Sequence, residues 1–119
     1  MIGGNKTVIL QVHTTGKNRI GEPVEAWHDV MYLTGYLDLS GGDSKYTTYN
    51  AKMQESTHLF ICDYVSIPKE INVDGKNIRV NAENCRMMAD SQVYDVLIID
   101  NPMELNQQLE IYMKYTGGQ

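Results

Sequence analysis

The sequence predicts a small all-β domain, a barrel or sandwich of mostly antiparallel strands. Short runs of β-branched and aromatic residues recur about every ten residues, and Gly, Asn and Asp separate them. The chain has 119 residues, of which 42% are hydrophobic and 21% charged. That length and composition are typical of one globular domain, so we expect residues 1–119 to form a single β-barrel domain.

The first two strands are expected before residue 40. Residues 7–13 are rich in β-branched side chains and predict a strand, and residues 14–18 read as the turn after it. Residues 24–39 are ambiguous, because Pro23 is a good first residue for a short amphipathic helix, whereas the apolar side chains also alternate. We favour one long strand, bent near Gly35, since glycine inside a strand often marks a bulge.

A long loop is expected between the second and third strands. Residues 40–55 have no convincing apolar face, and loops of this length in a compact domain are usually functional or disordered. Between Asp43 and Glu55 lie two Lys and two Tyr without an acid. Stacking aromatics beside basic groups suit a local contact with DNA. A solvated loop remains the other interpretation.

Three further elements follow the loop. Residues 57–64 are apolar on both faces and predict a central strand. A small hairpin is expected over 71–80 around Asp74-Gly75, because this pair tolerates the positive φ of a type I′ turn. Residues 85–99 predict another hairpin around Asp90-Ser91.

The last element is open to two interpretations. Asn101 and Glu104 resemble a capping pair, which favours a helix start. However, apolar and polar residues alternate over 109–115, as in a strand with one buried face. We expect a brief turn or 3₁₀ segment at 102–106, then a strand, and a flexible tail at 116–119.

Charge is distributed unevenly. The net charge of -5, from ten basic and fifteen acidic residues, argues against general binding to phosphate backbones. Residues 1–20 contain bases and no acid, whereas residues 21–30 contain three acids. Such a contrast either complements a neighbouring subunit or forms a solvated face. The candidate interface residues are Lys17, Arg19, Glu22 and Glu25.

No catalytic or metal-binding pattern stands out. His58 and Cys62 lie roughly 13 Å apart in an extended strand, too far for a thiol–imidazole pair. Asp95 and Asp100 face opposite sides of a strand, and the histidines lack metal-ligand spacing. We therefore expect no enzyme activity, no metal and no cofactor. Whether Cys62 pairs with Cys85 is left open. No apolar run is long enough for a membrane span, and the N-terminus lacks a signal-peptide pattern.

The order of these features resembles that of the head–tail joining proteins of tailed bacteriophages, of the head-closure or stopper type. The resemblance covers nearly the whole chain, except for residues 68–81. Its motifs are, in chain order, Glu25-Ala26-Trp27, Gly35-Tyr36-Leu37-Asp38, Ser44-Lys45-Tyr46, residues 56–64, Arg86-Met87, Tyr94-Asp95-Val96, Ile99-Asp100-Asn101-Pro102 and Leu109-Glu110-Ile111-Tyr112.

The resemblance implies a structural virion protein, assembled in the host bacterial cytoplasm, that closes the DNA exit channel after packaging and joins head to tail. It implies a homo-oligomeric ring, dodecameric in this family, between the portal or adaptor ring and tail proteins, with no membrane partner. The resemblance further implies that packaged DNA passes the loop that follows the second strand. The DNA-facing residues would be Gly41, Gly42, Ser44, Lys45, Tyr46, Tyr49 and Lys52.

Two alternatives remain open. The chain is either a minor capsid or tail-completion protein of the same particle, or a small barrel that binds single-stranded nucleic acid.

Overall fold

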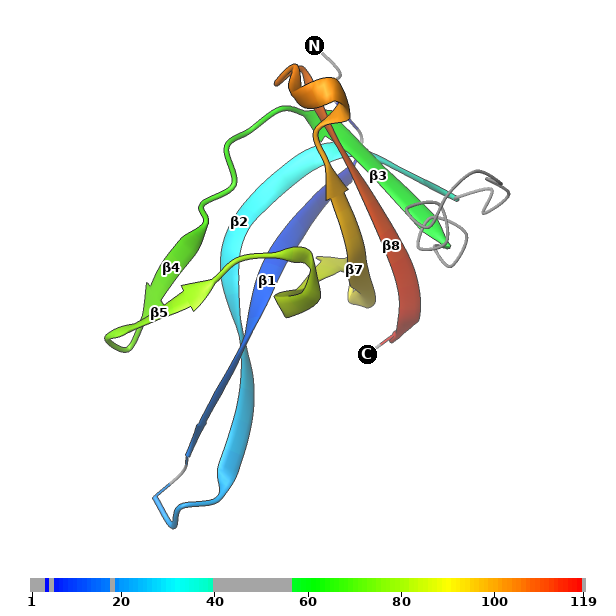
Figure 1. Cartoon of the computed structure of the whole chain (residues 1–119). Helices are drawn as coiled ribbons and strands as arrows, with labels where there is room; N and C mark the ends of the chain where they lie inside the picture. The colour runs from blue at the N-terminus through cyan, green and yellow to red at the C-terminus, as the bar shows by residue number, and fades with distance from the viewer. Residues whose placement is uncertain (1–3, 5, 18, 40–56, 119) are drawn as a thin grey trace.

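The computed structural model describes residue 4 and residues 6–17, 19–39 and 57–118. It confirms a small all-β fold with antiparallel pairing throughout (Figure 1). The strands are β1 Lys6–Lys17, β2 Pro23–Leu39, β3 His58–Asp63, β4 Glu70–Val73, β5 Lys76–Arg79, β6 Cys85–Ala89, β7 Gln92–Asp100 and β8 Gln108–Gly118. Two short 3₁₀ turns, η1 Ala82–Asn84 and η2 Pro102–Glu104, precede β6 and β8.

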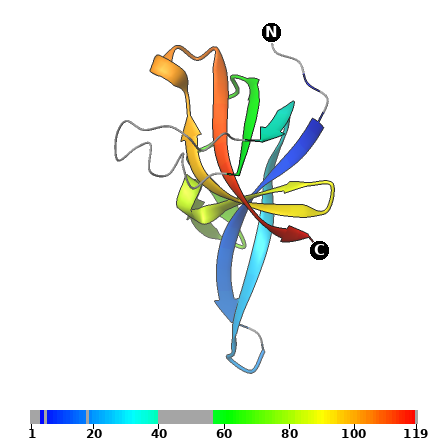
Figure 2. The ribbon, with the colours of Figure 1, turned by 90° about the vertical axis from the view of Figure 1, so that its right-hand side faces the viewer.

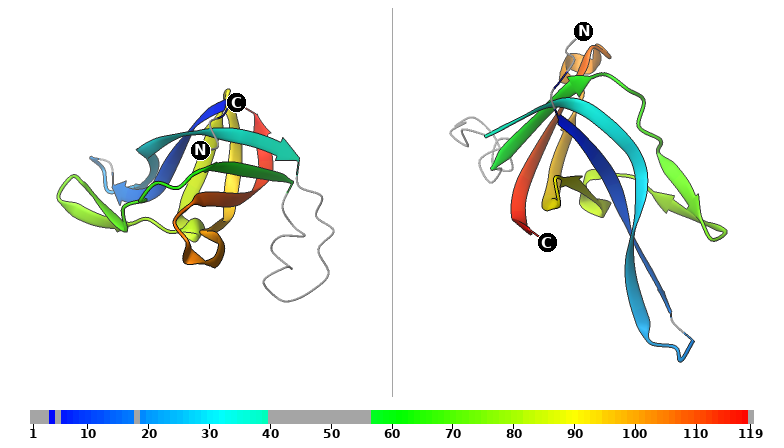
Figure 3. Two further views of the ribbon diagram at one scale, coloured as in Figure 1. Left: turned by 90° about the horizontal axis from the view of Figure 1, so that it is seen from above. Right: turned by 180° about the vertical axis from the view of Figure 1, so that it is seen from behind.

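Six strands form a closed barrel in the order β1-β2-β3-β8-β7-β6. The barrel closes where Ile9–Val12 of β1 pair with Met88–Cys85 of β6. Figure 3 shows these strands from above and from behind. Alternate side chains of each strand point inward and fill the interior. The fully buried ones are Phe60, Leu10, Met87, Ile111, Met113, Val8, Val12 and Cys62.

The β1–β2 pair continues beyond the barrel as a two-stranded ribbon (Figure 2). β6 pairs with β1 only as far as Val12, and β3 pairs with β2 only from Gly35 onward. The molecule is consequently elongated, with extents of 48 × 28 × 26 Å. The turn predicted at 14–18 is wrong, because the β-branched threonines there stay in the ladder and Lys17 pairs with Pro23. The chain reverses further on, where Gly21 adopts a φ of 83°.

The long second strand is confirmed, but the bulge predicted near Gly35 lies at another position. The irregular position is Val30, because the register passes from Leu10↔Met31 to Gln11↔Asp29 and leaves Val30 as an extra residue. Gly35 pairs regularly on both of its sides. It is needed there for another reason, which is the close approach of β3. A Cβ at position 35 would lie 2.8 Å from Cys62 Cβ and closer still to the Ile61 carbonyl oxygen.

Both tight hairpins follow the prediction. Asp74 and Gly75, between β4 and β5, have φ of 52° and 82°, as a type I′ turn requires. Asp90 and Ser91 have φ of 50° and 67° between β6 and β7. Residues 68–81, which the resemblance leaves unaligned, contain the β4–β5 hairpin. Its Ile71 and Ile78 are half-buried against the core.

The chain end is a strand, as expected from the alternation over 109–115. Leu109, Ile111 and Met113 of β8 are buried. In place of the expected flexible tail, β8 continues to Gly118, because Gly117 and Gly118 pair with Val93 and Gln92. Within the described part of the chain, no helix is both long and apolar enough to cross a membrane.

Candidate functional site

The four predicted interface residues lie at the outer end of the β1–β2 ribbon. Lys17 is at the end of β1, Arg19 and Glu22 are in the connection, and Glu25 is on β2; all are exposed. The hairpin therefore brings the basic and the acidic residues together at one tip, instead of placing them on two separate faces. Sequence order alone did not indicate this, because the turn was placed too early.

The outer face of the ribbon is fixed to the barrel by a polar network. The Arg86 guanidinium on β6 lies 4.3 Å from the centre of the Trp27 ring, and its Nε donates to Gln11 Oε1 at 2.8 Å. Gln11 Nε2 in turn donates to Asp29 Oδ1 at 2.8 Å. The His13 ring lies 5.0 Å from that of Trp27. These contacts orient the ribbon. Sequence reasoning missed them because Arg86 is 75 residues from Gln11.

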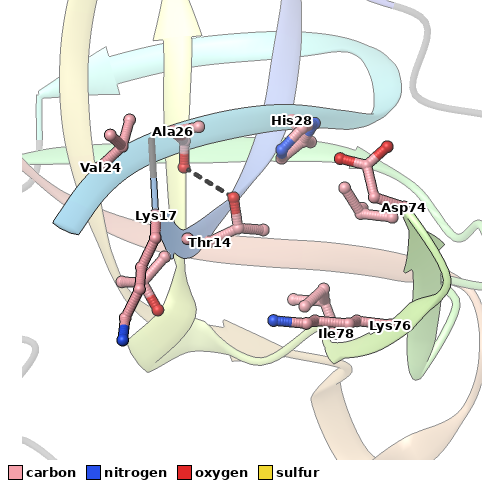
Figure 4. Close-up of a pocket in the computed structure, with 11 residues that line it drawn as sticks. Thr14, Lys17, Val24, Ala26, His28, Asp74, Lys76 and Ile78 are labelled. Atoms are coloured by element: carbon pink, nitrogen blue, oxygen red, sulfur yellow. Dashed lines mark hydrogen bonds between the residues drawn. The ribbon is translucent and has the colours of Figure 1, made fainter. Parts of the chain in front are cut away.

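The inner face of the ribbon forms one wall of a groove (Figure 4). Strand alternation continues the core-facing side of the barrel past Val12, so that Thr14, Ala26 and Val24 point the same way. The β4–β5 hairpin supplies the other wall through Val73 and Ile78. The groove has a volume of about 370 Å³. It is an apolar extension of the core that the chain itself leaves open.

Charged groups line the two ends of this groove. Figure 4 shows the amino groups of Lys17 and Lys76 toward one end, with His28 and Asp74 toward the other. Lys17 and Lys76 also line an adjoining hollow. Because two cations share one end, that end attracts an acidic group. Lys17 belongs to the predicted interface, whereas Lys76 was not singled out from the sequence.

A third cluster lies where the chain enters β3. The His58 ring contacts the Tyr94 ring edge-on at a centroid distance of 4.9 Å, and Tyr94 lies 5.5 Å from Tyr115. Thr57 Oγ1 is 2.8 Å from His58 Nδ1 and accepts from the Tyr115 backbone N–H at 2.7 Å. This cluster fixes the start of β3.

The predicted DNA-facing residues lie outside the described part of the chain. They are Gly41, Gly42, Ser44, Lys45, Tyr46, Tyr49 and Lys52.

The remaining candidates for chemistry occupy structural positions. Cys62 and Cys85 are buried free thiols, and burial raises the pKa of each to about 11. A thiol with so high a pKa is a poor nucleophile at neutral pH. Asp95 is exposed and pairs in the ladder with Lys114, whereas Asp100 lies opposite Glu110. Among the described residues, no group of His, Cys, Asp and Glu side chains is arranged to hold a metal ion.

Comparison with known proteins gives no independent assignment. No protein-family model matches the chain, and no curated protein matches it.

Proposed function

We propose that this chain is a head-closure connector protein of a tailed bacteriophage, a structural component of the virion and not an enzyme. The observation that carries the proposal is the combination of a closed antiparallel barrel with the long connection between β2, which ends at Leu39, and β3, which begins at His58. The resemblance of the sequence puts the channel segment at that same connection. The projecting ribbon adds a means of reaching a neighbouring subunit.

In this proposal the barrel is the scaffold and residues 40–55 gate the channel. Gly41 and Gly42 give the backbone the freedom to swing between two arrangements. Lys45 and Lys52, with the two tyrosines between them, supply a limited contact to DNA. The net charge of -5 suits this role, because a channel that lets DNA pass must not hold it tightly. The partners are further copies in a ring, the portal or adaptor ring, and tail proteins.

Deletion of residues 43–52 tests the gate. We expect the variant to fold, because the deleted residues belong to none of the described strands, and to join particles that then lose packaged DNA. The measurement is nuclease-sensitive DNA per particle, with thermal unfolding of the isolated chain as the folding check. A variant in which residues 43–52 are replaced by Gly and Ser at the same length is the matched control for the side chains. Particles with the deletion that retain DNA normally would refute gating.

The basic and aromatic residues of the same segment also support the second candidate, a barrel that binds single-stranded nucleic acid. Titration of the isolated protein with single-stranded DNA distinguishes the two. Tight binding at moderate salt that disappears in Tyr46→Ala/Tyr49→Ala favours this second function. Absence of such binding favours the connector.

A further inference from the structure

The connection between β7 and β8 exposes two large apolar side chains. Met103 is 86% exposed and Leu105 is 55% exposed, and the two lie only two positions apart in the chain. We call residues 101–106 the β7–β8 loop. Singly exposed apolar residues are ordinary, but two on one protruding loop form a small apolar patch of the kind that marks an interaction site.

The β7–β8 loop is held in one shape. Asn101 Nδ2 donates to Asn106 Oδ1 at 2.7 Å, and Asn106 N–H donates back to Asn101 Oδ1 at 3.1 Å. Met103, Glu104 and Asn106 have backbone φ angles of 54°, 54° and 56°. Residues other than glycine rarely adopt this left-handed conformation. A loop fixed in this way loses little conformational freedom when it binds a partner.

The loop is also acidic. Glu104 lies between the two exposed apolar residues, and Asp100 precedes the loop. Residues 95–113 contain four acidic residues and no basic one. The β7–β8 loop therefore presents an apolar pair with a negative charge between them.

The groove between the ribbon and the β4–β5 hairpin has the complementary properties. Val24, Ala26 and Ile78 make its lining apolar, and Lys17 and Lys76 place two positive charges at one end. Its volume of about 370 Å³ is of the order of two or three side chains, so Met103 and Leu105 are of the right size to enter it.

The loop and the groove cannot meet within one chain. Figures 1 and 2 show the β7–β8 connection at one end of the elongated molecule and the tip of the ribbon at the other. We propose that the β7–β8 loop of one copy docks in the groove of the next, with Met103 and Leu105 on the apolar lining and Glu104 between Lys17 and Lys76. This inference rests on the proposed connector function for its biological setting, a ring of identical subunits.

A contact between different faces of two copies is heterologous, and it repeats from copy to copy until it closes. One loop in one groove buries little area, so the isolated pair is weak and a closed ring is needed to hold the copies. This explains why an apolar loop and an apolar groove stay open on a single chain.

Inter-copy cross-linking tests the contact in the full chain. We expect Met103→Cys/Val24→Cys to form a ladder of dimers, trimers and longer species at high protein concentration under mild oxidation. The native Cys62 and Cys85 are buried and do not interfere. Met103→Cys/Asp95→Cys is the control, because Asp95 is exposed on β7 and outside the groove. Cross-linking no greater than in the control, or a series that stops at the dimer, would overturn the proposal.

Charge exchange supplies the second readout. In the cross-linking background, Glu104→Lys or Lys17→Glu/Lys76→Glu should each lower the cross-linked fraction by about tenfold, and the combination should restore it. Lys69→Glu, a matched reversal outside the groove, should change nothing. Failure of the exchange to restore the ladder contradicts the assigned pairing. Leakage of DNA from the deletion particles together with a missing ladder would retain the connector function and reject only this contact.

Discussion

Gly35 lies where two strands of the barrel approach each other closely. Its position in β2 faces the backbone of β3 so closely that an added methyl group meets both the Ile61 carbonyl oxygen and Cys62 Cβ. We expect Gly35→Ala to lower the free energy of unfolding by about 2 kcal/mol, because strands β2 and β3 must move apart. Urea denaturation measures the change.

Gly16 provides the matched control for that substitution. It lies in β1, and a Cβ built there meets nothing within 4 Å. Gly16→Ala should therefore leave the free energy of unfolding within about 0.5 kcal/mol of the original value. Equal destabilisation by the two substitutions would show that close packing is not what requires glycine at position 35.

The two buried cysteines make stability depend on alkaline pH. Burial raises the pKa of Cys62 and Cys85 to about 11, whereas a cysteine in the unfolded chain has a pKa of about 8.5. In the folded state the two thiols keep their protons to higher pH than in the unfolded state. Their contribution to the free energy of unfolding is therefore complete below about pH 8.5 and is lost as pH rises toward about 11. We expect the free energy of unfolding to fall by roughly 3 kcal/mol between pH 7 and pH 9.5.

Urea denaturation at pH 7, 8.5 and 9.5 checks this expectation. In Cys62→Ala/Cys85→Ala the decrease should shrink to a small remainder, whatever the loss of packing does to the absolute stability. Tyr94, whose pKa burial also raises, titrates mostly above this pH window. A decrease of the same size in the double variant would contradict the assignment to the thiols.

At the scale of the element, local chemistry predicted most of the strands and both tight turns. Asp74-Gly75 and Asp90-Ser91 reverse the chain where their residue types tolerate positive φ. The same reasoning misplaced the first turn, because Gly16 looks like a turn residue but lies in the ladder, and Gly21 makes the reversal. The sequence alone does not show why a glycine stands at a given position. Gly21 has a positive φ, Gly35 allows a neighbouring strand to approach closely, and Gly16 does neither.

The groove lay beyond what the sequence could predict. Its walls come from residues as distant as Ala26 and Ile78, and only the closure of the barrel and the length of the ribbon bring them together. Of the four residues predicted to form an interface, only Lys17 lines the groove, and the charge contrast that singled it out is local in the sequence. The interface itself stays a prediction. Lys76, which lines the groove from the β4–β5 hairpin, carries no local signal.

At the scale of the whole molecule, an elongated subunit presents different faces at its two ends. The ribbon tip carries Lys17 and Arg19 together with Glu22 and Glu25, and the opposite end carries the acidic β7–β8 loop. In the proposed ring such subunits assemble head to tail. There Lys17 and Lys76 at the groove meet the acidic loop of the next copy, whereas pairing of two β7–β8 loops brings like charges together.

Reversal of the basic residues at the ribbon tip tests this view of assembly. Lys17→Glu/Arg19→Glu should weaken ring assembly on the portal complex by at least about tenfold, because two cations facing an acidic neighbour become two anions. Sedimentation or negative-stain imaging of reconstituted complexes measures the occupied fraction, and Lys69→Glu/Lys114→Glu controls for the change in net charge. Unchanged assembly of the double variant would refute a role for this charge contrast.

The single variants show which part of the tip makes the contact. Lys17 lines the groove between the ribbon and the β4–β5 hairpin, whereas Arg19 lies beyond it in the connection. If the neighbouring copy occupies the groove, Lys17→Glu alone should reproduce most of the loss, and Arg19→Glu should have little effect. The loss should also diminish as salt is raised, because the charges at the groove mouth are exposed to solvent. A larger effect of Arg19→Glu would instead place the contact on the tip of the ribbon and leave the groove to another partner.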